Sequence, residues 1–186
     1  MALYFAETER LRLRTLERDD LPRYAGLIGD WEVSRWLFHV PHPYTHQDAE
    51  SWLDHLTPSY EAGRPELFVI VDKDYDFVMG AIGLHASAAP KPAEGEIVLG
   101  YWLGKPYWGQ GFMSEAVPPV LKIALARSYI NKITTFTDLN NFASQNVLRK
   151  TGFRYLGMGP RVEQYCLRGG EEVTRWEMTR EDYRSR

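Results

Sequence analysis

Two glycines stand where the chain changes from a strand-like to a helix-like pattern. Residues 99–117 read LGYWLGKPYWGQGFMSEAV, so Gly109 and Gly111 bracket one glutamine directly before the helical pattern. The first turn of a helix has free backbone N–H groups and the positive end of the helix dipole, and glycine lets an anion approach them closely. The segment therefore predicts a phosphate-binding turn, with an ordinary structural turn as the alternative.

The best-known phosphate-binding patterns do not match this turn. No lysine follows the glycines as in GxxxxGK[ST], and Ser114 stands where GxGxxG requires its third glycine. The turn is therefore not expected to be a nucleoside-triphosphate loop or a dinucleotide fingerprint.

Metal and thiol chemistry have weaker support. His39, His42 and His46 have a spacing that zinc sites use, but prolines lie among them and no cysteine is near. Cys166 is the only cysteine, and it lies far along the chain from the glycine turn. We therefore expect no metal site, no internal disulfide and no acyl-carrying thiol.

The glycine turn needs a strand before it and a helix after it, and hydrophobic periodicity supplies both. Thr45 and Asp48 resemble a capping box that starts an earlier helix, which Pro58 should end or bend. Pro118 and Pro119 predict a late start or a kink in the helix after the glycine turn. Strands are expected at residues 10–16, 66–74, 77–86, 96–103, 132–138, 153–158 and 172–179, and helices near 21–28, 45–58, 117–125 and 144–151.

Length and composition limit the class of protein. The 186 residues are 44% hydrophobic and carry a formal net charge of −3. These values predict a single α/β domain over residues 1–186, with a mixed sheet and helices on its faces. The charge balance argues against a nucleic-acid partner, and the apolar runs are too short for a membrane span. With one cysteine and no signal-peptide pattern, we expect a cytoplasmic protein.

A second motif, TDLNNFASQNVLRKTGFRYLG at residues 137–157, follows one helix and one strand later. Together the two segments resemble the GNAT superfamily of acyl-CoA N-acetyltransferases, in particular the branch that contains the ribosomal-protein N-terminal acetyltransferases. The family's phosphate loop reads Q/R-x-x-G-x-G/A, and its second element reads N-x-x-S…GF. In the loop, Trp108 stands at the first position, Gly111 at the fourth and Met113 at the sixth, a variant typical of that branch, and Asn141, Ser144, Gly152 and Phe153 match the second element.

The resemblance implies a GNAT fold of the α+β type, with a mixed sheet of about seven strands and helices on both faces. Strands 96–103 and 132–138 would splay apart to hold the pantetheine arm of acetyl-CoA, the co-substrate. The diphosphate would rest on the amides of residues 109–114. The cofactor-binding residues implied in this way are Tyr101, Trp102, Leu103, Trp108, Gly109, Gln110, Gly111, Phe112, Met113, Ser114, Asn141 and Asn146.

The family's reaction is direct attack of an amine on the thioester in a ternary complex. It needs a base, donors for the oxyanion and a proton for the leaving thiolate. Much of the superfamily has a tyrosine seven residues after the asparagine, but that position is Leu148 here. Ser144 is the catalytic proton donor that this branch would offer instead. A backbone N–H within residues 101–103 is the candidate oxyanion donor.

No residue is an obvious base. Alignment with the branch puts Val98 where a glutamate often stands, and Glu96 lies two residues earlier on the same strand face. We expect Glu96 to act through a water molecule, with His39, His42 and His85 as rivals.

The acceptor is expected to be an amine-bearing molecule, either a peptide N-terminus or a small polyamine, with an aminoglycoside as a further alternative. Trp36, His39, Tyr44 and His85 are the expected substrate-binding residues, although the aromatic side chains could instead pack the first helices against the sheet. A non-catalytic acyl-CoA-binding protein of the same fold and a cofactor-free interaction module are the alternatives to an enzyme. Both a monomer and a homodimer are compatible with the sequence.

Overall fold

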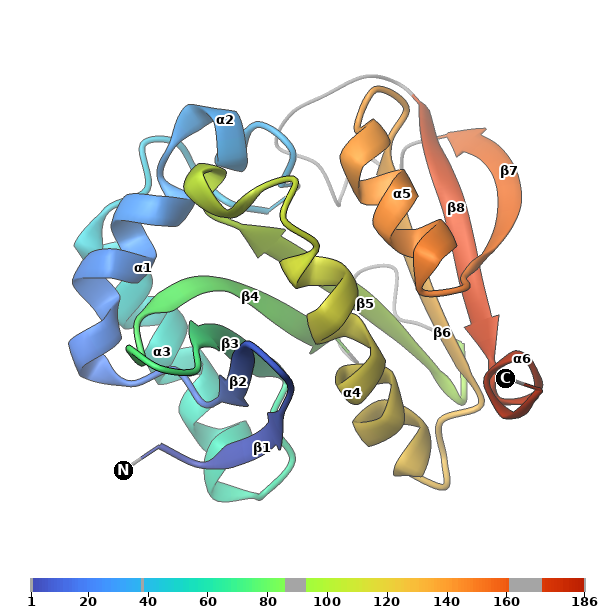
Figure 1. Cartoon of the computed structure of the whole chain (residues 1–186), viewed down its shortest axis with the longest axis horizontal. Helices are drawn as coiled ribbons and strands as arrows, with labels where there is room; N and C mark the ends of the chain where they lie inside the picture. Colours follow the sequence, from blue (N-terminus) through green and yellow to red (C-terminus); the bar gives the residue numbers. More distant parts are fainter. Residues whose placement is uncertain (1, 38, 86–92, 161–171, 186) are drawn as a thin grey trace.

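The computed structural model describes residues 2–37, 39–85, 93–160 and 172–185 (Figure 1). Cys166 therefore lies outside the described residues. No helix in the described part of the chain is long and apolar enough to cross a bilayer. The elements are β1 (Tyr4–Glu7), β2 (Leu11–Arg14), the 3-10 helix η1 (Arg18–Asp20), α1 (Leu21–Ile28), α2 (Trp31–Ser34), α3 (His46–Glu61), β3 (Leu67–Asp72), β4 (Val78–His85), β5 (Glu96–Leu103), the 3-10 helix η2 (Lys105–Tyr107), α4 (Phe112–Ala126), β6 (Lys132–Asp138), α5 (Phe142–Lys150), β7 (Arg154–Pro160), β8 (Glu172–Thr179) and α6 (Arg180–Arg184).

The described strands form one mixed sheet in the order β1-β2-β3-β4-β5-β6-β8-β7. All seven strands expected from the sequence are present, and the predicted mixed α/β architecture is confirmed. The sheet has eight strands rather than about seven, because β1 adds to its edge by pairing antiparallel with β2.

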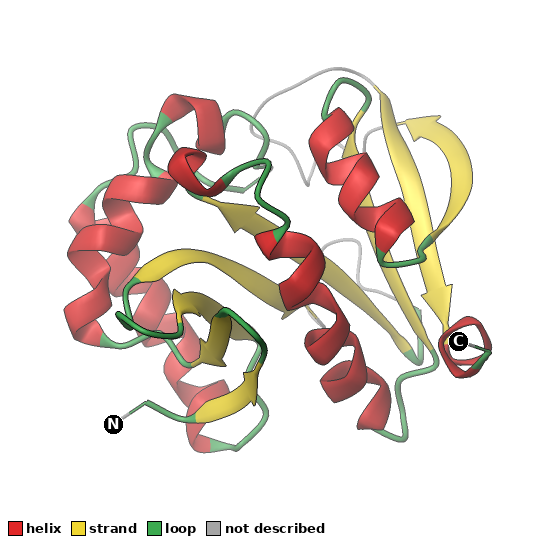
Figure 2. Ribbon diagram, viewed as in Figure 1, coloured by secondary structure: helices red, strands yellow, loops and turns green. Residues whose placement is uncertain are grey.

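Helices cover both faces of the sheet (Figure 2). One hydrophobic cluster joins alternate residues of β4 and β5, such as Leu84 and Leu99, to the inner side of α4, including Val117 and Val120. The other cluster joins the opposite strand residues, including Trp102, to α1 and α3. Successive side chains of a strand point to opposite faces, so β5 contributes to both layers.

The predicted splay of two central strands is present between β5 and β6. These parallel strands pair at only three positions, from Glu96–Lys132 to Val98–Thr134. Beyond this point β5 continues to pair with β4, and β6 continues to pair with β8. Within the described residues, the facing edges of β5 and β6 therefore have no strand partner over their last residues, where a ligand can add main-chain contacts.

Two expectations about prolines differ from the structure. The capping box of α3 is confirmed, with Thr45 N donating to Asp48 Oδ2 at 2.7 Å and Asp48 N to Thr45 Oγ1 at 3.2 Å. The helix nevertheless continues past Pro58 to Glu61, because a proline in the final turn removes only one hydrogen bond. The expected late start of α4 is wrong, since the helix begins at Phe112 and contains both later prolines.

Candidate active site

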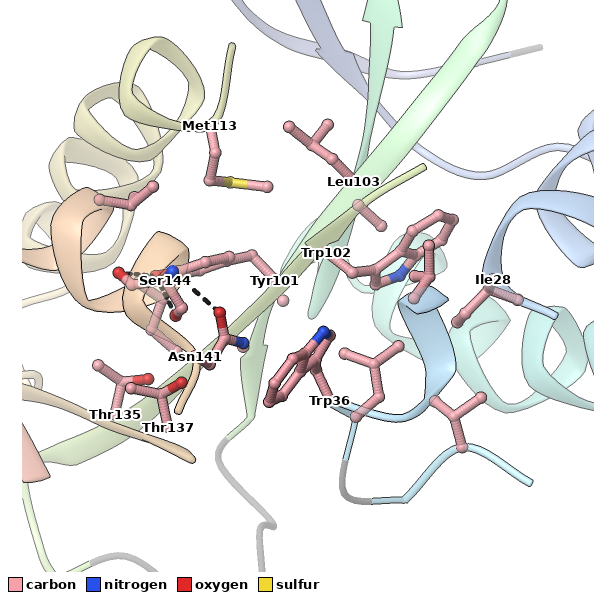
Figure 3. Close-up of a pocket in the computed structure, with 18 of the residues that line it drawn as sticks. Ile28, Trp36, Tyr101, Trp102, Leu103, Met113, Thr135, Thr137, Asn141 and Ser144 are labelled. Carbon is pink, nitrogen blue, oxygen red and sulfur yellow. Dashed lines mark hydrogen bonds between the residues drawn. The ribbon is translucent and has the colours of Figure 1, made fainter. Parts of the chain in front are cut away.

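A pocket of about 1240 Å³ opens where β5 and β6 part. One side is lined by residues 135–137 of β6, the start of α5 and the start of α4. The other side is lined by residues from α1, α2, α3 and the loop before α3. Figure 3 shows Asn141, Ser144 and Tyr101 on one side of this pocket, and Trp36, Trp102 and Ile28 on the other.

The glycine turn forms the α4 end of the pocket with its backbone amides available. Gly109 and Gly111 have φ angles of +74° and +83°, a conformation that side-chain-bearing residues rarely adopt. Gly111 is the N-cap of α4 and no side chain caps this end. Among the described residues, no hydrogen bond uses the N–H groups of residues 109–114. The helix start can therefore bind an anion.

An ion pair holds this turn against the first hairpin. Glu115, in the first turn of α4, accepts hydrogen bonds from Thr8 Oγ1 at 2.6 Å, Arg10 N at 2.9 Å and Arg10 Nε at 2.7 Å. Burial raises the pKa of Glu115, but these hydrogen bonds outweigh it and the net pKa is lowered. Arg10 Nη1 also donates to the carbonyl of Gln110 at 3.1 Å. The Glu115 carboxylate and the Gln110 carbonyl, two acceptors at the turn, are thus already paired with donors from the first hairpin.

The side chain of Gln110 does not line the pocket, although its backbone N–H belongs to the turn. The side chain instead donates to the carbonyl of Pro106 at 2.8 Å. Trp108 lines the pocket, and its indole Nε1 donates to the carbonyl of Leu103 at 2.7 Å. The structure brings the other expected cofactor residues to the pocket wall: Tyr101, Trp102, Leu103, Gly109, Gly111, Phe112, Met113, Ser114, Asn141 and Asn146.

Ser144 is positioned by both α5 and β5. Asn141 is the N-cap of α5, and its side-chain oxygen accepts from Ser144 N at 3.1 Å. The hydroxyl of Tyr101 lies 2.9 Å from Ser144 Oγ and 3.2 Å from the Ser144 carbonyl oxygen (Figure 3). Sequence reasoning placed both residues at the site but missed this pair, because it depends on how β5 and α5 meet.

The Tyr101–Ser144 pair supplies a phenol where α5 lacks one. Leu148, at the family's tyrosine position, is fully buried in the hydrophobic cluster beneath α4. Burial raises the pKa of Tyr101 well above its ordinary value, and the hydrogen bond with Ser144 only partly opposes this. The phenol therefore stays protonated at neutral pH and can donate to Ser144.

Two of the candidate bases lie elsewhere. Glu96 is in the paired part of β5 and does not line the pocket; its carboxylate accepts from Thr134 Oγ1 at 2.7 Å and pairs with Lys132 Nζ at 3.1 Å. His42 is also absent from the lining, and its Nδ1 lies 3.3 Å from Ser34 Oγ. Neither Glu96 nor His42 therefore lines the pocket in which the base must act.

The remaining expected residues lie in the second half of the pocket. Trp36, His39, Tyr44 and His85 all line it. Asp48, Trp52, His55 and Glu66 are among the lining side chains that sequence reasoning did not assign to the site. The rings of Trp52 and His55 stack with centroids 5.1 Å apart on α3. In the sequence, the three-residue spacing of Trp52 and His55 on a predicted helix could have indicated that the two rings lie on the same helix face.

Known proteins resemble this chain in sequence and in fold. The family model for the acetyltransferase (GNAT) domain matches residues 10–154. A Bacillus licheniformis protein named as uncharacterized N-acetyltransferase p20 is 28% identical over 151 residues, which cover 81% of this chain and 83% of that protein.

Two solved structures share the fold. The ribosomal-protein-S5-alanine acetyltransferase from Vibrio fischeri has a TM-score of 0.79 and 21% identity, covering 97% of this chain and 98% of that one. RimL, a ribosomal L7/L12 alpha-N-protein acetyltransferase solved with coenzyme A, has a TM-score of 0.78 and 18% identity, covering 95% and 98%. Since the family model spans most of the chain, and the parted strands and glycine turn occur as that family requires, this protein belongs to the GNAT family of acetyltransferases.

Proposed function

We propose that this protein transfers the acetyl group of acetyl-CoA to a primary amine, and that the amine is a protein N-terminus. The reaction would take place in one domain covering residues 1–186, in the cytoplasm. The observation that carries this proposal is the parting of β5 and β6 beside the uncapped start of α4. These two features create a main-chain edge and an anion site within one pocket.

The pocket fits the chemical parts of acetyl-CoA. The amides of residues 109–114 would hold the diphosphate, because they are donors at a helix N-terminus. The edge of β5 beyond Val98 would pair with the amide-bearing pantetheine arm in the manner of an added strand. Bound there, acetyl-CoA supplies a thioester as the acyl donor. A backbone N–H of residues 101–103 would donate to the oxyanion that forms during attack, because this part of β5 lines the pocket beyond its pairing with β6.

Ser144 is the proposed proton donor to the leaving thiolate, and Tyr101 is a positioning residue behind it. The phenol of Tyr101 has one proton and faces two acceptors on Ser144, the carbonyl oxygen at 3.2 Å and Oγ at 2.9 Å; in the proposed arrangement it donates to the nearer Oγ. When it does, the Ser144 proton is directed away from Tyr101 and is available to the pocket. This arrangement gives the serine the role that a tyrosine on α5 would otherwise have.

Two observations support an N-terminal amine as the acceptor. RimL is named for acetylation of the α-amino position of ribosomal L7/L12, and the Vibrio fischeri structure for an alanine of ribosomal protein S5. The second half of the pocket also contains the carboxylates of Asp48 and Glu66 and, within the described residues, no lysine or arginine of the helices and loop before β3. Such a lining attracts a cationic amine.

Thiol release from acetyl-CoA, followed with a chromogenic reagent, tests the acceptor. A short peptide with a free N-terminus should give turnover, and the same peptide with its N-terminus already acetylated should give none. Faster turnover with spermidine or an aminoglycoside than with any peptide would contradict the N-terminal proposal. Binding of acetyl-CoA without turnover on any amine would identify a non-catalytic acyl-CoA-binding protein.

The glycine turn can be tested with a matched pair of substitutions. Gly109 and Gly63 both have positive φ and no atom within 4 Å of a built Cβ, but only Gly109 lines the pocket. Each change to Ala should therefore cost a similar backbone strain of about 1–2 kcal/mol. Gly109→Ala should in addition weaken acetyl-CoA binding about 10–100-fold, the value of one charge-assisted hydrogen bond to phosphate.

Titration calorimetry measures the affinity, and thermal unfolding measures the strain. Equal acetyl-CoA affinities for Gly109→Ala and Gly63→Ala would show that the turn does not hold the diphosphate.

A further inference from the structure

His85, the last residue of β4, lies over two glycines. Gly83 of β4 and Gly100 of β5 are register partners in the sheet. A Cβ built on Gly83 would lie 2.6 Å from His85 Nε2, and one built on Gly100 would lie 3.2 Å from the same atom. The first distance is a steric overlap, so residue 83 must lack a side chain for the imidazole to keep this position. The absence of side chains at Gly83 and Gly100 leaves the space that the His85 ring occupies.

The two glycines and the His85 ring lie in the second half of the pocket, where the acceptor amine would bind. Gly83, His85 and Gly100 all line the pocket, and their alternation along the strands puts them on the same face as Trp102. Trp102 packs in the cluster formed with α1 and α3, whereas Tyr101 packs on the opposite face with α4. The side chains of His85 and Tyr101 therefore lie on opposite faces of the sheet.

Other titratable groups of the neighbouring elements line the same pocket as the imidazole, and His39 and His55 act on its charge. These groups are Tyr24 of α1, His39 and Tyr44 of the loop before α3, Asp48 and His55 of α3, and Glu66 before β3. Burial, together with His39 and His55, lowers the pKa of His85 to about 4. Burial raises the pKa values of Tyr24 and Tyr44, which stay neutral. At neutral pH the His85 ring is thus uncharged and has one nitrogen able to accept a proton.

We propose that His85 takes the proton of the acceptor's ammonium group before acetyl transfer. The proposal rests on the proposed function and adds the base that the sequence left open. One ammonium N–H bond breaks, its electron pair stays on nitrogen as the nucleophile, and one imidazole N–H bond forms. The imidazolium then returns the proton to water at the open side of the pocket.

The surroundings favour this transfer although the base is weak. Apolar side chains, among them Ile28, Trp36 and Trp52, line the same half of the pocket. Moving an ammonium group into such surroundings disfavours its charged form and lowers its pKa toward that of the imidazole. The carboxylates of Glu66 and Asp48, which line this half of the pocket, would attract the cation, and the apolar lining would then favour its release of the proton.

His85→Gln tests the proposal because glutamine keeps a polar side chain of similar reach without a basic nitrogen. An α-amino group has a pKa near 8, so only about one tenth of it is neutral at pH 7 and the variant should lose about tenfold in kcat/KM. At pH 9.5 nearly all of the amine is neutral, and the loss should shrink below about twofold. Acetyl-CoA affinity should not change at either pH.

Gly83→Ala provides a second variant that keeps the histidine but displaces its ring. It should show the same loss at pH 7 and the same recovery at pH 9.5. His46→Gln is the matched control, because His46 lies at the exposed start of α3 and outside the pocket. A loss in His85→Gln that is absent, or equal at both pH values, would overturn the role of His85. An inactive wild-type protein on every amine would instead overturn the proposed function.

Discussion

Ser144→Ala should lower kcat about 100-fold or more, the usual contribution of a positioned proton donor. The KM for acetyl-CoA should change less than about threefold, because the proposed cofactor contacts are made by the α4 turn and the edge of β5. The serine hydroxyl has a defined place, with Asn141 fixing its backbone and Tyr101 contacting its oxygen. Steady-state kinetics with a saturating peptide acceptor separates the two parameters.

The proposed roles of Tyr101 and Ser144 also predict how the effects of substituting both residues combine. Tyr101→Phe removes the contacts of the phenol with Ser144 Oγ and with the Ser144 carbonyl oxygen and should lower kcat about tenfold. Added to Ser144→Ala, it should have almost no further effect, because the phenol acts through the serine. Tyr75→Phe, on the exposed turn between β3 and β4, is the control. Independent, multiplicative losses from the two substitutions would refute the positioning role, and normal kcat in Ser144→Ala would refute the proton donor.

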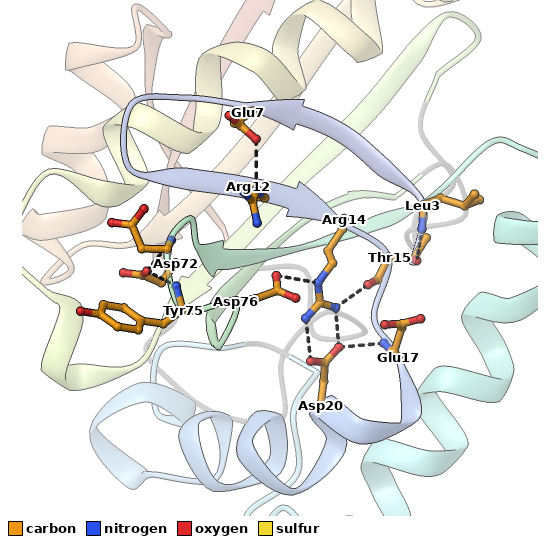
Figure 4. A network of polar contacts seen from close by, with 11 residues as sticks. Leu3, Glu7, Arg12, Arg14, Thr15, Glu17, Asp20, Asp72, Tyr75 and Asp76 are labelled. Carbon is orange, nitrogen blue, oxygen red and sulfur yellow. Dashed lines mark hydrogen bonds and ion pairs between the residues drawn. The ribbon is translucent and has the colours of Figure 1, made fainter. Parts of the chain in front are cut away.

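Arg14→Met should destabilise the fold by about 3–5 kcal/mol, the cost of breaking a buried ion pair on one side. Arg14 is 3% exposed and forms a two-pronged pair with Asp20, with Nη1–Oδ2 at 2.6 Å and Nη2–Oδ1 at 2.8 Å (Figure 4). Its guanidinium also donates to the Thr15 carbonyl at 3.0 Å and lies 3.5 Å from Asp76. Methionine fills the space but leaves a carboxylate that is 11% exposed without its cation.

Denaturant or thermal unfolding measures this loss, which corresponds to a drop in Tm of about 6–20 °C for a chain of this size. Arg12→Met is the matched control on the same strand, since Arg12 pairs with the half-exposed Glu7 and should contribute little. An Arg14 variant that unfolds at the same temperature as the Arg12 variant would contradict the structural importance of the buried pair.

Much of the fold could be predicted from local patterns. Alternation in β2 and β-rich runs in β3 to β6 identified strands, and the Thr45–Asp48 box identified the start of α3. The strand β1 was missed because its four residues, YFAE, are partly exposed and show no alternation; pairing with β2 defines it. The start of α4 was misjudged because burial of one apolar face outweighs the two missing amide hydrogens of Pro118 and Pro119.

The site residues that belong to one contiguous sequence motif could be predicted. The contacts between residues far apart in the sequence could not. The glycine turn and the Asn141–Ser144 cap are each local, and both lie at the pocket as expected. The Tyr101–Ser144 contact spans 43 positions in the sequence and depends on how β5 and α5 meet in the fold. Glu96 lies on the same strand face as Val98, but it is in the part of β5 that still pairs with β6. The sequence around Glu96 does not show where this pairing ends.

The most direct test compares the binding of acetyl-CoA with that of S-acetyl-pantetheine, which lacks the diphosphate and nucleotide. By titration calorimetry, acetyl-CoA should bind one site per chain, and S-acetyl-pantetheine should bind at least about 100-fold more weakly, because it leaves the α4 amides without an anion. Failure of acetyl-CoA to bind, or equal affinity for the two thioesters, would contradict the assignment of the glycine turn and the parted strands to the acyl donor.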